Sequence, residues 1–130
     1  MVKVYTGSAR NTVNLTTRVY DTMGGTILSV DHGALVECIA VDTLGNIYTG
    51  GVRTGGKTTR KYAPDGSLTW SIDHGDSVYG IAVDLLGNVA IAGNRTFGSG
   101  DRSVRKYTSA GVHVFSKDIG GGACCVAVDY

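Results

Sequence analysis

The stretch from Gly80 to Gly93, G-I-A-V-D-L-L-G-N-V-A-I-A-G, decides the fold of this chain because its parts recur at other positions. The segment Ile81 to Asp84 occurs 42 residues earlier as Ile39 to Asp42 and 45 residues later as Val126 to Asp129. Self-similarity at a period of this length indicates a row of similar structural units, each covering the apolar face of the next.

The two ends of the chain belong to the same pattern. Asp129-Tyr130 followed by Met1 to Gly7 reads D-Y-M-V-K-V-Y-T-G, and it aligns without a gap on Asp42 to Gly50, D-T-L-G-N-I-Y-T-G. The three periods of 42, 45 and 43 residues account for all 130 residues. We therefore expect a single repeat domain over residues 1–130, in which one unit is divided between the two ends.

Composition and spacing predict strands within each unit. The chain has 20 glycines and one proline, and its apolar runs are rich in Val, Ile, Thr and Tyr, which favour strands. No window of helical length shows apolar residues at helical spacing. The unit that begins at Cys38 is expected to hold four short strands, which are Cys38–Asp42, Asn46–Gly51, Thr58–Ala63 and Leu68–Asp73. Four strands in about 42 residues are typical of one blade of a β-propeller.

The pattern G-I-A-V-D-x-x-G-N-V-x-x-x-G at Gly80 to Gly93 resembles the blade repeats of bacterial β-propellers of the NHL and SBBP kind. The resemblance covers the whole chain, and it implies an all-β fold in which the G-I-A-V-D strand is the innermost strand of each blade. The small residues on that strand, Ala40, Ala82 and Ala127, suit a crowded central axis. Propellers carry many unrelated activities, so the resemblance indicates a fold and not a function.

Three four-stranded blades are expected in each chain. Two are continuous, residues 38–73 and 80–117, and the third is split, with its inner strand at 124–130 and its outer strands within 1–31. Propellers usually have about 4 to 8 blades, and an open arc would expose strand edges. We expect the C-terminal strand of one chain to complete the split blade of a second copy, so that a head-to-tail homodimer closes a six-bladed ring. A three-chain ring and a fragment of a longer propeller are the alternatives.

Charge and hydropathy limit the expected partners. The formal net charge is +1 and no apolar run reaches the length of a membrane span, so neither a nucleic acid nor a membrane is expected as a partner. No signal-peptide pattern opens the chain, which favours a cytoplasmic or virion-associated protein. Cys38, Cys124 and Cys125 are expected to be buried free thiols. A disulfide between Cys124 and Cys125 is not expected, because neighbours on a strand point to opposite faces.

Two repeated sets of acidic residues are interpreted as turn residues. The pairs Asp31-His32 and Asp73-His74 suggest a catalytic or metal site, but the third copy has Ile119 in place of the histidine. Each aspartate also precedes a glycine turn whose amides it can cap. The second set comprises Asp42, Asp84 and Asp129. In a closed ring these carboxylates could form a circle that binds a cation, but each aspartate is expected to cap a turn in the same way.

Residues that recur in every blade are expected to build the scaffold. One such set is on the fourth strand, where Leu28, Trp70 and Phe115 are equivalent and should pack between blades. Trp70 could stack on a sugar only if it is exposed. The other set is the repeated arginines, which should pair with the aspartates or cover strand faces, an anion-binding rim being the alternative; they are Arg10, Arg53, Arg95, Arg18, Arg60 and Arg105. No catalytic residue, metal site or cofactor is predicted.

Positions that break the repeat are the candidates for binding. The loop Asp76 to Tyr79 differs from its counterpart Ala34 to Glu37, and the loop Thr96 to Arg102 is longer than its counterpart Thr54 to Lys57. The resemblance to propellers implies that these loops share one face near the channel. The candidate binding residues are His74, Asp76, Tyr79, Arg95 and Arg102.

Three classes of function are consistent with these observations. The first is a non-enzymatic binding module that recognises a small molecule, a glycan or a peptide at the mouth of the channel. The second is a purely structural role, in a bacterial or phage-like particle or as a designed symmetric scaffold. The third is an enzyme such as a propeller lyase or lactonase, which would need a convergent acid–base set or a metal ion.

Overall fold

The computed structural model describes residues 2–9, 15–96 and 102–129, with the backbone alone described at Arg95 and Arg102. These residues form an all-β structure of antiparallel sheets, as predicted. The strands are β1 (Val4–Gly7), β2 (Thr17–Tyr20), β3 (Thr26–Val30), β4 (Val36–Val41), β5 (Ile47–Thr54), β6 (Lys57–Tyr62), β7 (Leu68–Ile72), β8 (Val78–Val83), β9 (Val89–Thr96), β10 (Arg102–Tyr107) and β11 (His113–Lys117).

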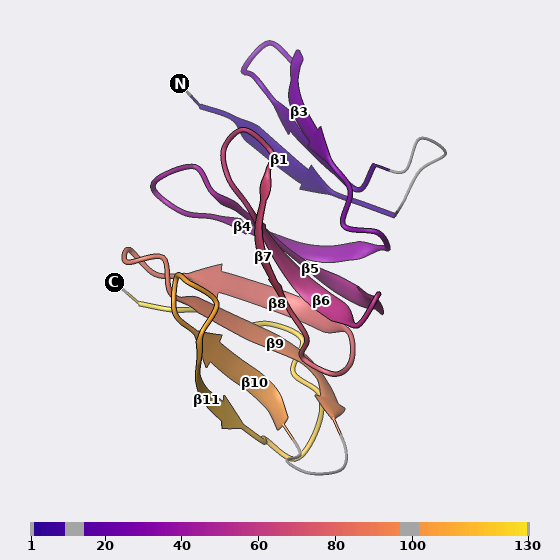
Figure 1. The fold of residues 1–130 in the computed structure, drawn as a ribbon, viewed down its shortest axis with the longest axis vertical. Coiled ribbons are helices and arrows are strands. Elements are labelled where there is room, and N and C mark those ends of the chain that lie inside the picture. The colour runs from indigo at the N-terminus through magenta and orange to yellow at the C-terminus, as the bar shows by residue number, and fades with distance from the viewer. Residues whose placement is uncertain (1, 10–14, 97–101, 130) are drawn as a thin grey trace.

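The strands form three separate sheets in which chain neighbours pair. The first sheet has the order β1-β2-β3, the second β4-β5-β6-β7 and the third β11-β10-β9-β8. Figure 1 shows the second sheet between the other two, so that the sheets follow one another like blades along an arc. The second sheet spans residues 36–72 and the third 78–117, so each begins two residues before the range expected for its blade, 38–73 and 80–117.

Carboxylate-capped turns connect the first two strands of the second and third sheets. Oδ1 of Asp42 accepts hydrogen bonds from the amides of Leu44 and Asn46, each at 2.9 Å. Gly45 in this turn has a φ of 84°, a conformation that favours glycine. Asp84 makes the same two bonds in the third sheet. The prediction that these aspartates cap turns is therefore confirmed for both. The third copy, Asp129, precedes Tyr130, which lies outside the described residues.

Apolar side chains fill the two junctions between adjacent sheets. Burial of these side chains is the main source of stability in such a fold, because each sheet is too thin to have a core of its own. The junction of the first and second sheets buries Val19, Val30, Ile47 and Tyr62. The junction of the second and third sheets buries Tyr48, Val78, Val83, Val89, Ile91 and Tyr107.

Residues 124–129 lie against the third sheet without joining it. A Cβ atom placed on Gly80 of β8 would be 2.7 Å from Cα of Cys125, and the amide of Ala123 donates to the carbonyl of Gly93 at 2.9 Å. In Figure 1 this segment is the yellow trace beside β8 and β9. It follows β8 as β8 follows β4, so it occupies the place of the innermost strand of a next blade. Within the described chain it is not part of any sheet.

The expectation of buried thiols is wrong for two of the three cysteines. Cys38 is half-buried, but Cys124 and Cys125 are exposed, and all three are free. The Sγ atoms of Cys124 and Cys125 are 3.7 Å apart, so they do not point to opposite faces. The physical reason is that residues 124–129 are not in a ladder here, and the alternation that a strand imposes does not apply to them.

Gly51 in β5, opposite Val36 at the open end of the β4–β5 hairpin, tests the close approach of these two strands. A Cβ atom on Gly51 would lie 2.0 Å from the carbonyl oxygen of Leu35, a backbone atom that the amide of Val52 also holds at 3.0 Å. We expect Gly51→Ala to lower the free energy of unfolding by about 2 kcal/mol or more, because the backbone must shift. Urea denaturation at fixed protein concentration measures this loss. The control is Gly121→Ala, where nothing lies within 4 Å of the added atom, and equal losses for the two variants would contradict the packing described.

Candidate functional site

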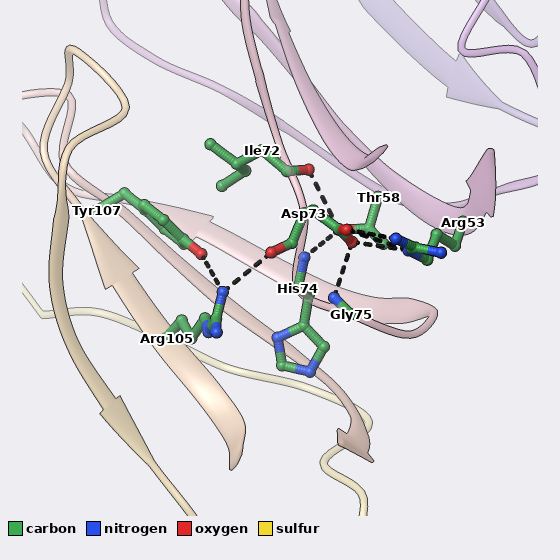
Figure 2. Close-up of polar contacts among 8 residues, drawn as sticks. All are labelled: Arg53, Thr58, Ile72, Asp73, His74, Gly75, Arg105 and Tyr107. Carbon is green, nitrogen blue, oxygen red and sulfur yellow. Dashed lines mark hydrogen bonds and ion pairs between the residues drawn. The ribbon is translucent and has the colours of Figure 1, made fainter. Parts of the chain in front are cut away.

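A dense set of polar contacts surrounds Asp73, where β7 ends (Figure 2). Its carboxylate accepts hydrogen bonds from Nε of Arg53 at 3.0 and 3.1 Å, from Nη2 of Arg53 at 2.7 Å and from the amide of Gly75 at 2.8 Å. The hydrogen bonds from the Arg53 guanidinium lower the pKa of the Asp73 carboxyl, so it is charged at neutral pH. The glycine bond recurs in the other two copies, at Asp31 and Asp118, which confirms that these aspartates form local turns.

The neighbouring His74 is a buried part of the scaffold. Its side chain has no exposed surface, its amide donates to Oγ1 of Thr58 at 2.9 Å, and its Nε2 lies 2.9 Å from the carbonyl oxygen of Asn94. Nε2 must therefore carry the proton and donate to that oxygen. Burial lowers the pKa of His74, which favours the neutral ring. The ring thus ties the end of the second sheet to β9 in the third.

Arginines on the third strand of a sheet hold the preceding sheet. Nη1 of Arg105 donates to the carbonyl oxygen of Asp73 at 2.9 Å and to the hydroxyl of Tyr107 at 3.0 Å (Figure 2). Arg60 donates in the same way to the carbonyl oxygen of His32. Their scaffold role is as predicted, but the partners are backbone carbonyls and not the expected aspartate side chains. A guanidinium reaches a carbonyl here because the aspartate side chain already turns back to cap its own loop.

Three side chains that flank this corner form a polar cluster at the surface, which we call the rim; they are Asp76, Tyr79 and Asn94. Nδ2 of Asn94 donates to Oδ1 of Asp76 at 3.1 Å and lies 3.4 Å from the hydroxyl of Tyr79. The Asp76 carboxylate also accepts from the amide of Ser77 at 2.6 Å. Asp76 is exposed, Tyr79 is 37% exposed and Asn94 is half-buried, so a carboxylate and a phenol face solvent and an amide links them.

The structure places the predicted binding residues in three different situations. Asp76 and Tyr79 meet at the rim through Asn94. His74 lies behind the rim, but it is fully buried and cannot contact a ligand without rearrangement. The side chains of Arg95 and Arg102 lie outside the described part of the structure, although their backbones belong to the hairpin of β9 and β10.

Sequence reasoning missed Asn94 and underrated Arg53. Asn94 stands where the second sheet has Val52, so it breaks the repeat and the criterion used for the loops would have found it. Arg53 is half-exposed, forms an ion pair with Asp73 and is also attracted by the charge of Asp76. It was grouped with the repeated arginines, since its position alone did not distinguish it.

Trp70 packs between sheets and is not a stacking platform. Its Nε1 donates to the carbonyl oxygen of Ser109 at 3.0 Å, and its ring meets that of Tyr48 edge to face at 5.9 Å. The packing role predicted for this position is confirmed. A pocket of about 290 Å³ opens at the far end of the same junction, between the turns that follow Asp42 and Asp84. Its polar groups Asp42 and Lys61 already hold the scaffold.

The described residues contain neither a metal-binding cluster nor a membrane-spanning helix. No group of three or more His, Cys, Asp or Glu side chains among them could hold a metal ion. None of the described segments is a helix long and apolar enough to cross a membrane.

Comparison with known proteins identifies the fold. No protein-family model and no curated protein sequence matches the chain. A solved structure of streptogramin B lyase matches it with a TM-score of 0.62 and 18% sequence identity, over 95% of this chain. The match spans 44% of the length of that lyase. The likeness supports β-propeller-like repeats and, at this identity, says nothing of activity.

The buried histidines predict how stability depends on pH. Burial, and secondarily the charge of Arg60, lower the pKa of His32 to about 4 from 6.5. The unfolded chain therefore binds the proton first, so stability is full above pH 6.5 and is lost as the pH falls toward 4. We expect a loss of about 2 kcal/mol between pH 7 and pH 4.5, with His74 adding in the same direction.

His32→Asn should flatten this pH dependence, because the amide can replace the contact of Nδ1 with Oγ1 of Thr49 at 2.9 Å without titrating. Urea unfolding at several pH values and one protein concentration measures the slope. His113→Asn is the matched control, since His113 is exposed and its variant should keep the slope of the parent. An unchanged slope in His32→Asn would rule out this assignment.

Proposed function

We propose that the chain is a non-enzymatic binding module that recognises a polar ligand, a glycan in the first instance, at the rim of Asp76, Tyr79 and Asn94. The observation that carries the proposal is the convergence of the exposed Asp76 and Tyr79 with the half-buried Asn94 at the start of an inner blade strand. A carboxylate, an amide and a phenol offer donors and acceptors suited to sugar hydroxyls, and the tyrosine ring offers an apolar face. A peptide backbone or a small polar molecule would use the same groups.

The scaffold beneath the rim supports binding without chemistry. Acid–base catalysis needs a group that can exchange a proton with a substrate near neutral pH. Arg53 holds the Asp73 carboxylate in its charged form. His74 is fully buried, and its Nε2 is engaged by the carbonyl oxygen of Asn94. Both therefore act by fixing the positions of Asn94 and the loop at Asp76. This arrangement favours preorganised recognition over turnover.

We also propose that the module acts as a ring of six blades made from two copies. Each copy provides three sheets. Closed propellers usually have about 4 to 8 blades, so one copy has too few to close a ring. Two copies related by a twofold axis along the channel would give six. A ring without a ligand, serving only as a structural element, is the second possibility, and the absence of binding would favour it.

The first test of this proposal is binding to a printed glycan array followed by titration calorimetry with the best glycan. We expect Tyr79→Ala to weaken binding by at least about tenfold, since it removes both the ring face and a hydroxyl. The control is Leu86→Ala. Leu86 is 80% exposed and lies in the turn between β8 and β9, at the end of this hairpin that is far from the rim. Equal affinities for the two variants would exclude the rim as the binding site.

The second test is the mass of the protein in solution, measured by light scattering on a sizing column. One chain has a mass of 13.5 kDa, and we expect about 27 kDa for the two-chain ring. About 40 kDa would indicate three chains and nine blades. A folded species of 13.5 kDa that persists at high concentration would refute the ring and leave the binding proposal to the first test.

A further inference from the structure

We infer that a second copy of this chain docks its first sheet on the open face of the third sheet, with β1 of that copy pairing with residues 124–129. The inference rests on the proposed ring and assigns the contacts that close it. The two junctions inside the chain provide the template, because equivalent residues of the three sheets can be matched by their strand pairing. Lys61 pairs with Trp70 as Lys106 pairs with Phe115.

The junction of the second and third sheets shows how one sheet covers the face of the sheet before it. Nζ of Lys61 and Nε1 of Trp70 both donate to the carbonyl oxygen of Ser109, at 3.1 and 3.0 Å. The turn that carries Ser109 places Gly111 on the ring of Trp70, so close that a Cβ atom there would be 3.2 Å from it. Gly111 has a φ of 81°.

The junction of the first and second sheets repeats this arrangement. Leu28 pairs with Val19, which makes it the equivalent of Trp70. A Cβ atom on Gly66 would lie 2.7 Å from Cδ1 of Leu28, and Gly66 has a φ of 89°. A glycine turn therefore covers the outermost strand of the preceding sheet in both junctions.

The same two features, an apolar side chain on the outermost strand and a glycine turn, are exposed at the two ends of the arc. Phe115, the equivalent of Leu28 and Trp70, is 41% exposed. It lines an open groove of about 580 Å³ with Lys106, Ala90 and residues 126–129. The first sheet has the matching turn at Gly24, with a φ of 83° and nothing within 4 Å of an added Cβ atom. Gly24 of a second copy fits Phe115 as Gly111 fits Trp70.

The strand edges are complementary as well. Among the described strands, β1 pairs only with β2, whereas its equivalents β5 and β9 each pair with an inner strand on the other side as well. Val4 of β1 is 52% exposed, while its equivalents Ile47 and Val89 are 1% and 0% exposed. Residues 124–129 lie against β8 in the place of an inner strand and are not part of a sheet. The free edge of β1 could therefore form the ladder with residues 124–129 that neither has within the described chain.

The register of the pairing follows from the template. Val41 pairs with Ile47 in the second sheet and Val83 with Val89 in the third. The same alignment places Val128 opposite Val4 of the second copy, and Val126 opposite Thr6. Within one chain the second sheet separates the first sheet from residues 124–129 (Figure 1), so this pair can form only between copies.

An engineered disulfide tests the register. The amide of Asp42 donates to the carbonyl of Asn46, so the next pair, Val41 and Ile47, is a close non-hydrogen-bonded pair, and such pairs suit a disulfide. In the double variant Val4→Cys with Val128→Cys, we expect mild oxidation to give a covalent two-chain species of about 27 kDa, twice the 13.5 kDa of one chain. The product is measured by non-reducing electrophoresis and by intact mass.

The outcomes separate this inference from the ring itself. A matched control is Val2→Cys with Val128→Cys, which is out of register by two residues and should cross-link at least about tenfold more slowly. The parent protein controls for the native cysteines. A species of two-chain mass in which Val4→Cys with Val128→Cys fails to cross-link, or reacts no faster than the control, would overturn the register and leave the ring. A ladder of higher covalent multiples would show an open chain of copies, and a monomer at every concentration would refute both.

A second pair of variants tests the docked face without cysteines. Phe115→Ala should raise the dimer dissociation constant by at least about tenfold, measured by sedimentation over a dilution series. Val114→Ala changes the neighbouring residue, which is 52% exposed and points to the opposite side of β11, and should change it less than about threefold. Equal effects of the two variants would exclude the face of Phe115 as the contact.

Discussion

Packing of one sheet face on the next is the interaction on which the rest of this structure depends. A meander of four short strands has two faces and little interior, so it is stable only where a neighbour covers it. The covered faces bury the equivalents Ile47 and Val89, and the uncovered face exposes Val4. Stability therefore belongs to the junctions between sheets more than to the sheets themselves. At the ends of the arc, where no described sheet covers the outer face, Val4 and Phe115 are exposed.

The corner at Asp73 shows how a junction can also position a functional surface. Arg105 reaches across from the third sheet to a backbone carbonyl of the second, and His74 reaches back to the carbonyl of Asn94. These two contacts run in opposite directions between the same sheets. The side-chain amide of Asn94 in β9 is thereby held beside Asp76 and Tyr79.

The fold could be predicted from the sequence because its determinants are local and repeated. Turn residues such as Asp42 recur in register, and their interpretation needs no knowledge of distant contacts. The placement of His74 could not be predicted, since its burial depends on a carbonyl twenty residues away in another sheet. Asn94 could have been predicted, because it breaks the repeat at the position of Val52, but that criterion was applied only to the loops. The exposure of Cys124 could not be predicted either, because residues 124–129 are not part of a sheet in the described chain.

The rim occurs in only one of the three sheets, because the other two lack equivalents of Asp76 and Asn94. A twofold ring would therefore carry two rims on the same face, half a turn apart. A ligand with a repeating unit long enough to span them could engage both at once, and the second contact would benefit from a high effective concentration. Such a ring would discriminate polymers by the spacing of their epitopes, and single units would bind it weakly.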